Sequence, residues 1–191
     1  MAALHRGGIT DRAEFYGSMA NLIRQNLTAP GRKEVSARMA SFHAPFWDGA
    51  VQQQPTNGSQ TFFSYYTKGA GLALYLDLYL REKSGNKRSL DDVFNTLKHM
   101  VWDAPNATYY LQGRGYTEQD VERAASQVAG EDMHPWFERY VGGTADLDYD
   151  TLLADAGLRL VRDDRWRIEE LPGATPAQLT VREGWISGRH Q

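Results

Sequence analysis

Apolar side chains recur at helical spacing along most of the chain. Thr10 is suited to cap a first helix, and the residues that mark its apolar face are Phe15, Met19, Leu22, Ile23 and Leu27. A weaker helix is predicted at residues 32–42, and Pro45, shortly after it, prevents its continuation. The most hydrophobic helix is predicted at residues 62–83, and Ser84-Gly85-Asn86 stops it.

Further helices are marked by capping signals. Ser89 with Asp92 and Thr117 with Asp120 predict helices that run to about residues 100 and 129. Shorter helices are expected at residues 133–141 and 150–156, the second with Gly157 as its C-cap. The stretches at residues 52–60 and 104–115 are polar and rich in turn formers, so they are predicted to be loops.

The last part of the chain has a different pattern. Residues 158–161 and 165–170 are predicted to pair as a small β-hairpin. Thr175, Pro176 and Gln178 then combine an N-cap, a proline at the first helical position and a capping-box partner, which predicts a terminal helix to about Ile186. We therefore expect an all-α bundle or array at residues 1–157, and a short extension at 158–191 formed by the hairpin and the terminal helix.

Composition narrows the function classes only slightly. The 191 residues are 41% hydrophobic and 24% charged, which is typical of a globular protein. The absence of cysteine excludes disulfides, iron–sulfur clusters, thiol nucleophiles and cysteine-ligated zinc. A net charge of −3 gives no electrostatic reason to expect nucleic acid or an anionic membrane as a partner.

The familiar catalytic motifs are absent from the sequence. The five histidines are far apart, with no H-E-x-x-H, so no self-contained metal site is predicted. A phosphate-binding loop, a dinucleotide fingerprint and a nucleophile elbow are also missing. The acidic pairs fall in first turns of helices or beside the hairpin, where a solvated structural role is expected.

One segment carries candidate chemistry. The sequence S-Y-Y-T-K-G at residues 64–69 opens the most hydrophobic helix, so this motif is anchored to the core. A phenol in such a position can donate a hydrogen bond to a developing oxyanion. Lys68 could favour a phenolate or bind a carboxylate. The competing interpretation is that these aromatic side chains only pack in the core.

This segment and its neighbours resemble the glycyl aminopeptidase family of zinc metallopeptidases. The resemblance is carried by residues 64–69, by Asp77, by Arg81-Glu82 and by the Ser-Leu-Asp-Asp cap at residues 89–92. It extends over about residues 5–162. The family implies a helical bundle that forms the C-terminal part of a gluzincin-type catalytic domain.

The resemblance also implies roles for particular residues. By analogy with the Tyr-x-Lys-Gly motif of related gluzincin aminopeptidases, Tyr66 would stabilise the oxyanion of the tetrahedral intermediate. Tyr65 and Lys68 become candidate substrate-binding residues. The family's zinc ligands and general base would lie before the segment that resembles residues 4–10, so this chain is expected to lack them and to hold no metal itself.

Three functional hypotheses follow. The first is a part of an aminopeptidase-like metallopeptidase, which releases N-terminal Gly or Ala in the complete enzyme and is inactive alone. The second is a non-catalytic helical module of that fold that binds peptides or acts as a scaffold. The third is a remnant in which the aromatic helix is only core.

The expected partners are a peptide substrate and the missing N-terminal catalytic portion, with no nucleic acid or membrane partner. An exposed apolar face that promotes self-association is also expected. The chain start lacks the pattern of a signal peptide, which predicts a cytoplasmic location by default, although a full-length precursor could be exported.

Overall fold

The computed structural model describes residues 2–44, 63–103 and 115–190. Its helical elements, in chain order, are α1 (Ala2–Arg6), α2 (Arg12–Thr28), η1 (Pro30–Lys33), α3 (Ala37–Phe42), α6 (Tyr65–Ser84), α7 (Leu90–Val101), α9 (Glu118–Ala129), α10 (His134–Phe137), η3 (Glu138–Gly142), α11 (Tyr149–Asp155) and α12 (Pro176–Ser187). The strands β1 (Leu158–Val161) and β2 (Arg167–Glu170) form an antiparallel hairpin between α11 and α12. The prediction of a mostly helical fold with a hairpin and a terminal helix is confirmed.

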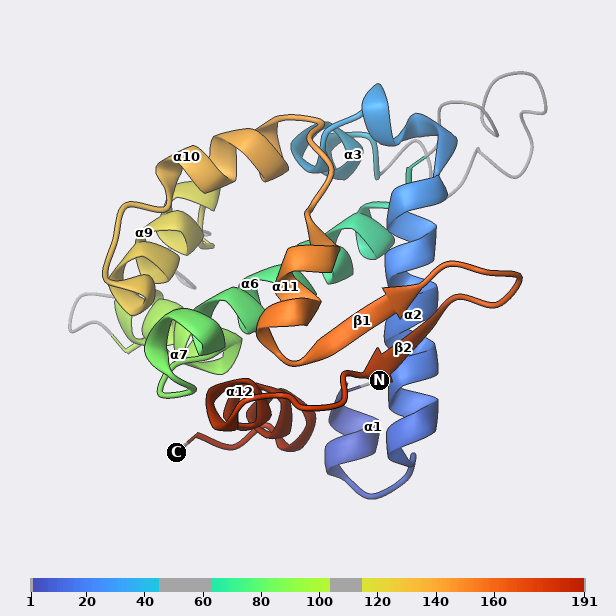
Figure 1. The fold of residues 1–191 in the computed structure, drawn as a ribbon. Coiled ribbons are helices and arrows are strands. Elements are labelled where there is room, and N and C mark those ends of the chain that lie inside the picture. The colour runs from blue at the N-terminus through green and yellow to red at the C-terminus, as the bar shows by residue number, and fades with distance from the viewer. Residues whose placement is uncertain (1, 45–62, 104–114, 191) are drawn as a thin grey trace.

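Helix α6 is the centre of the molecule. It runs through the middle of the fold and contacts α2, α3, α7, α9, α11 and α12 (Figure 1). Leu74 and Leu78 pack into one hydrophobic cluster with α2, α11, the hairpin and α12. Leu76 and Leu80 pack into a second cluster with α7, α9 and α10. A helix that is apolar around most of its circumference is buried on several sides, as the sequence predicts.

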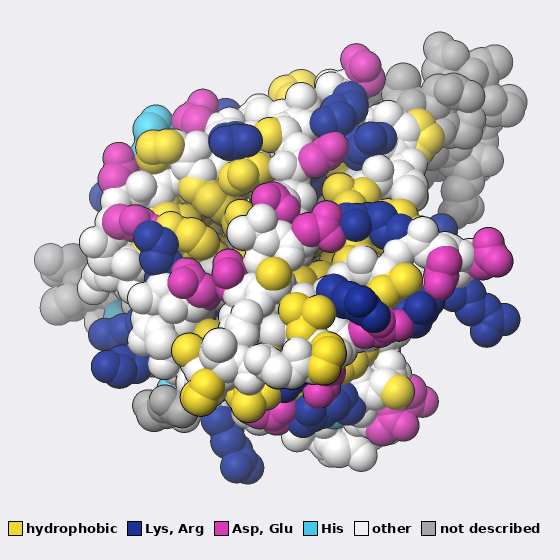
Figure 2. Space-filling model, in the orientation of Figure 1, with side chains coloured by type: hydrophobic (Ala, Val, Ile, Leu, Met, Phe, Trp, Pro, Cys, Tyr) yellow, Lys and Arg dark blue, Asp and Glu magenta, His cyan; other side chains and the backbone are white. Residues whose placement is uncertain are grey.

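Partly buried side chains join the two clusters. Tyr79, Trp136 and Val141 pack against both of them. Figure 2 shows hydrophobic side chains gathered in the region between α6, α9 and α10, with acidic and basic side chains scattered over the rest of that face. The boundary between the two clusters is therefore partly exposed at the surface.

The capping predictions are confirmed with small shifts of the boundaries. Ser89, Thr117 and Thr175 each cap a helix in a reciprocal capping box with the residue three positions later. Gly85 ends α6 with a φ of +60°, a conformation that favours glycine. The predicted hairpin is present, with Leu158 opposite Glu170 and Val161 opposite Arg167.

Several boundaries differ from the sequence predictions. Asp11, rather than Thr10, caps α2, because its carboxylate accepts from the backbone N–H of Glu14 while the Glu14 side chain accepts in return. The helix predicted at residues 32–42 is interrupted, since η1 ends at Lys33 and Ser36 caps a new helix, α3. The predicted helix at 133–141 continues from α10 into a π-helical turn, η3. Ala156, not Gly157, is the C-cap of α11.

The loop predicted at residues 52–60 and nearly all of the one predicted at residues 104–115 lie outside the described residues. Within the described residues, every helix is either too short or too polar to cross a lipid bilayer.

Candidate functional site

The predicted catalytic segment forms the start of α6. The Ser64 hydroxyl caps this helix by accepting a hydrogen bond from the Thr67 backbone N–H at 3.4 Å. Tyr65 and Tyr66 follow, and their ring centroids are 4.2 Å apart. The Tyr66 side chain is 71% exposed, whereas Tyr65 is half-buried. The structure therefore brings these two tyrosines together at the surface and directs the phenol of Tyr66 outward.

Lys68 lies on a different side of the helix. It is only 3% exposed, and its Nζ lies 5.2 Å from the centroid of the Phe63 ring. Burial lowers the pKa of the Lys68 ammonium; nearby Asp146 opposes this shift, and Lys33 and Arg32 reinforce it. Because Tyr66 is exposed and Lys68 is buried, the structure does not place the two side chains on one surface. The substrate-binding role of Lys68 stays a prediction.

Asp146 organises the charges near Lys68. Its carboxylate lies 2.7 Å from Lys33 Nζ and 3.4 Å from Arg32 Nε. Asp146 therefore pairs with two basic side chains of η1 and also acts electrostatically on the ammonium of Lys68 in α6. Because burial disfavours its charge and Lys33 and Arg32 share the same carboxylate, the ammonium of Lys68 is more easily deprotonated than an exposed lysine.

The motif residues farther along α6 form a buried polar network. The carboxylate of Asp77 accepts a hydrogen bond from the Leu90 backbone N–H at 2.9 Å and lies 3.3 Å from Arg81 Nε. The guanidinium of Arg81 is fully buried and donates to Asn86 Oδ1 at 2.6 Å and to the Arg189 carbonyl at 3.1 Å. This network ties α6 to the start of α7 and to the C-terminal segment, which is a structural role.

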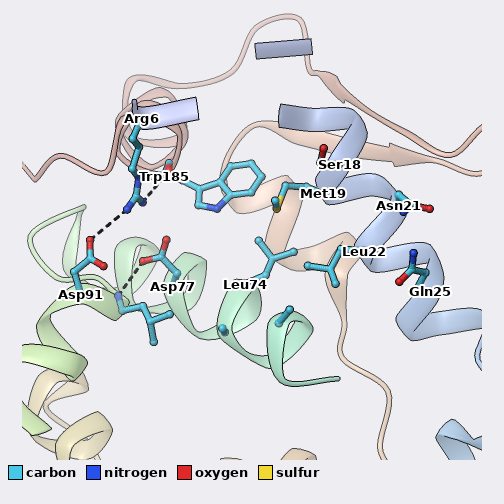
Figure 3. Close-up of a pocket in the computed structure, with 13 residues that line it drawn as sticks. Arg6, Ser18, Met19, Asn21, Leu22, Gln25, Leu74, Asp77, Asp91 and Trp185 are labelled. Carbon is cyan, nitrogen blue, oxygen red and sulfur yellow. Dashed lines mark hydrogen bonds and ion pairs between the residues drawn. The ribbon is translucent and has the colours of Figure 1, made fainter. Parts of the chain in front are cut away.

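A cavity of about 590 Å³ lies beside this network (Figure 3). Residues of five helices line it: Arg6, Ser18, Met19, Asn21, Leu22, Gln25, Ala70, Ala73, Leu74, Asp77, Leu90, Asp91 and Trp185. Met19, Leu22 and Leu74 lie between α2 and α6, while Arg6 and Asp91 meet at one end beside Trp185. Tyr65, Tyr66 and Lys68 are not among the lining residues, so the cavity and the tyrosine pair are separate features of α6.

Sequence reasoning did not find this cavity. Arg6 comes from α1 and Trp185 from α12. The ion pair of Arg6 with Asp91 spans 85 residues of sequence, and its contact with the Trp185 carbonyl spans 179. No local spacing pattern connects such residues. The one available signal was Asp77, a charged residue within an otherwise apolar helix.

The residues described by the structure do not fit a zinc ion. His99 lies 2.7 Å from Asp103, His134 lies 3.0 Å from Glu122 and His190 lies 3.6 Å from Asp92, so each of these imidazoles has one carboxylate neighbour. Among the described residues, no three side chains of the His, Asp and Glu types gather as metal ligands. A zinc site needs three or four such donors at one point.

Two comparisons with known proteins were informative: no curated protein matches the chain, whereas one family model matches its first 72 residues. The family match covers α1, α2, η1, α3 and the first two turns of α6, and it therefore includes Tyr65, Tyr66 and Lys68. Residues 1–72 match the family model of the M61 glycyl aminopeptidases, which supports an origin of the chain in a glycyl aminopeptidase-like peptidase.

Proposed function

We propose that this chain is the helical part of an aminopeptidase-like metallopeptidase and that its contribution to peptide-bond hydrolysis is the phenol of Tyr66. The observation that carries the proposal is the position of this tyrosine. It stands in the first turn of α6, within the part that matches the family, and its side chain is 71% exposed. An exposed phenol on a helix that is anchored along its length can meet a substrate bound against this surface.

The chemistry of the phenol follows from its single donor. When water attacks a peptide carbonyl, negative charge develops on the carbonyl oxygen, and a positioned O–H can donate a hydrogen bond to it. Leu72, Leu74 and Leu78 fix α6 in the core, so the backbone that carries the phenol is in place before the charge appears. Tyr65, whose ring contacts that of Tyr66, would line the same substrate surface.

The metal ligands and the general base are then supplied by polypeptide outside the described residues. The described histidines and carboxylates do not form a donor set, and the roles that we assign to the described residues are hydrogen bonding and substrate positioning. Release of N-terminal Gly or Ala is the activity that we propose for the complete enzyme.

A second candidate is a non-catalytic module that binds peptides or acts as a scaffold. It is favoured by aromatic side chains that stand well out of the surface, because Phe42 is 70% exposed and Tyr66 is 71% exposed. Aromatic residues are enriched where proteins bind other chains. In this candidate Tyr66 would contact a peptide without taking part in hydrolysis.

The first experiment measures hydrolysis of alanyl p-nitroanilide by the chain with added zinc. We expect no turnover and no stoichiometric zinc, because the described side chains offer no site for the ion. Turnover together with one bound zinc per chain would contradict the proposal that the metal ligands lie elsewhere.

The second experiment compares peptide binding by the wild type and by Tyr66→Phe, with a labelled peptide that has an N-terminal alanine. Phenylalanine keeps the ring and removes the hydroxyl, so a hydrogen bond to the peptide would be lost and binding would weaken roughly two- to tenfold. Tyr116→Phe is the matched control, because Tyr116 is 66% exposed and precedes α9. If the peptide binds equally to both variants, its site is not at Tyr66.

A further inference from the structure

The cavity beside the Asp77 network has the size and the lining of a ligand site. Its volume of about 590 Å³ falls within the range of roughly 300 to 1,000 Å³ that is common for small-molecule sites. It lies where α1, α2, α6, α7 and α12 come together. This position is distinct from the exposed tyrosine pair, and the inference that follows does not depend on the proposed peptidase function.

The walls of the cavity favour an apolar group. Met19 of α2 and Leu74 of α6 are 8% and 6% exposed, and Leu22 of α2 and Trp185 of α12 add to this apolar lining. Helix α6 also presents Ala70 and Ala73 to the cavity, whose side chains are too small to fill the space. An apolar side chain that enters the cavity would remove water from these surfaces, which is the main favourable term in such binding.

One end of the cavity carries two opposite charges. Arg6 Nη1 lies 3.4 Å from Asp91 Oδ2, and Arg6 Nη2 lies 3.4 Å from the carbonyl oxygen of Trp185 (Figure 3). Both contacts are longer than the usual 2.7–2.9 Å of a charge-assisted hydrogen bond. The Asp91 side chain is 54% exposed, so water weakens this pair further. The Arg6–Asp91 pair is therefore easily opened by a ligand that offers better partners.

The guanidinium of Arg6 is nevertheless held in position. It lies against the backbone of Gly188, where an added Cβ would come within 2.5 Å of Arg6 Nε. Gly188 ends α12 in the left-handed conformation, with a φ of +75°. The close approach to this glycine restricts the side chain at the rim of the cavity, so less ordering is needed when an anion binds than for a freely exposed arginine.

The other carboxylate in the lining, that of Asp77, already has partners within the protein. Asp77 pairs with the buried Arg81 and accepts from the Leu90 N–H. Among the described residues that line the cavity, a ligand therefore meets one available cation, Arg6, and one available anion, Asp91, with apolar side chains beside them.

We propose that this cavity binds a free α-amino acid with a large apolar side chain. The carboxylate of the ligand pairs with Arg6, and its ammonium group pairs with Asp91. In an α-amino acid the two charged groups are attached to one carbon, so they match a pair of protein charges that lie side by side. The side chain then occupies the space between Leu22, Leu74 and Ala73. A molecule with only one of the two charges would separate Arg6 from Asp91 and leave one of them without a partner.

The experiment is a calorimetric titration with L-phenylalanine, N-acetyl-L-phenylalanine and L-phenylalaninamide. The last two compounds keep the ring but lack the ammonium group and the carboxylate, respectively. We expect L-phenylalanine to bind and each analogue to bind roughly tenfold more weakly, the usual effect of losing one charged hydrogen bond. Binding of the two analogues as tight as that of L-phenylalanine would overturn the proposal, as would the absence of L-phenylalanine binding at millimolar concentration.

Protein variants locate the site. Arg6→Met and Asp91→Asn each remove one charge at the rim, and we expect each to weaken L-phenylalanine binding roughly tenfold. Ala73→Leu fills the cavity and should abolish binding, with circular dichroism to confirm the fold; the two charge variants decide the question if this variant does not fold. Arg159→Met is the control, because Arg159 pairs with Glu169 on the hairpin. Unchanged binding in both charge variants would place the ligand elsewhere and refute the proposal.

Discussion

Gly71 of α6 lies where side chains of α2 and α11 come close to the backbone of α6. A Cβ at this position would lie 2.6 Å from Asn26 Nδ2 and 2.6 Å from the hydroxyl oxygen of Tyr149. Asn26 is 5% exposed and Tyr149 is 2% exposed, so neither side chain can move into solvent to make room. The glycine is therefore needed for space rather than for backbone conformation.

Replacing this glycine should be costly. We expect Gly71→Ala to lower the free energy of unfolding by about 1–3 kcal/mol, as overpacking a tight core usually does. Urea denaturation followed by circular dichroism measures the change.

Gly69→Ala provides the matched control two residues earlier in the same helix. No atom lies within 4 Å of a Cβ at Gly69, so alanine there should stabilise α6 by about 0.5–1 kcal/mol through its higher helix propensity. Equal effects of the two alanines would show that the contacts of Gly71 with α2 and α11 are not tight in solution.

Arg81 shows what the sequence could and could not predict at the scale of single residues. Its place in a motif on α6 was visible, and so was Asp77 four residues earlier. Its bond to the carbonyl of Arg189 could not be predicted, because 108 residues separate the two groups. The same limit applies to Lys68. It lies two residues after Tyr66 in the sequence, but only the folded structure shows that it is buried, with Phe63 against its ammonium group and Asp146 acting on its charge.

At the scale of elements, the helix starts were the most predictable feature. Capping boxes are local, because the N-cap and the residue three positions later satisfy each other's backbone N–H groups. They were recognised at Ser89, Thr117 and Thr175, and the structure confirms all three. Helix α1 was missed since it has only five residues, and its packing on α2 and α12 stabilises it more than its own sequence does.

The capping box of α9 leads to a pH-dependent prediction. Hydrogen bonds from the backbone and hydroxyl of Thr117 hold the pKa of Asp120 below its ordinary value of 3.8, and Arg123 acts in the same direction. A carboxyl group whose pKa is lower in the folded state stabilises the fold above its unfolded pKa. This stabilisation is lost as the pH falls through the folded pKa.

Asp120→Asn should therefore lower the stability of the protein at pH 7 by about 1 kcal/mol, the usual scale of a capping interaction. The difference from the wild type should start to shrink as the pH falls below the ordinary pKa of 3.8, and it should vanish once the pH is below the lowered pKa of Asp120 in the folded protein. Thermal unfolding between pH 2 and pH 7 measures both effects. Asp164→Asn, in the turn of the hairpin, is the control and should show no such trend; a pH-independent deficit in Asp120→Asn would contradict the explanation.

At the scale of the whole molecule, the C-terminal segment belongs to the same packing unit as the N-terminal helices. Leu158 from β1 and Trp185 from α12 join Phe15 and Ile23 from α2 in one cluster, in which all four are at most 3% exposed. The ring of Trp185 lies 4.8 Å from that of Phe15 between centroids. The sequence change near residue 158 suggested a separate extension, and this division stays a prediction that truncation can test.

We expect residues 1–157 alone to fail to form a cooperatively folded structure, because the truncation removes the partners of α2 and α6. Near-ultraviolet circular dichroism and binding of a hydrophobic dye would show the loss of packing. Trp185→Ala in the full chain is the milder companion variant, with an expected loss of about 3–5 kcal/mol. A sharp two-state unfolding transition for residues 1–157 would instead support an independent domain.

The bond between Arg81 and the carbonyl of Arg189 also bears on how the protein is made in the cell. A ribosome completes α2 and α6 long before it reaches Trp185 and Arg189, so these early helices must wait with their apolar faces uncovered. Chains in that state are prone to aggregate. Slow translation of the last third of the message would lengthen this wait, and chaperones that shield nascent chains should increase the yield of folded protein.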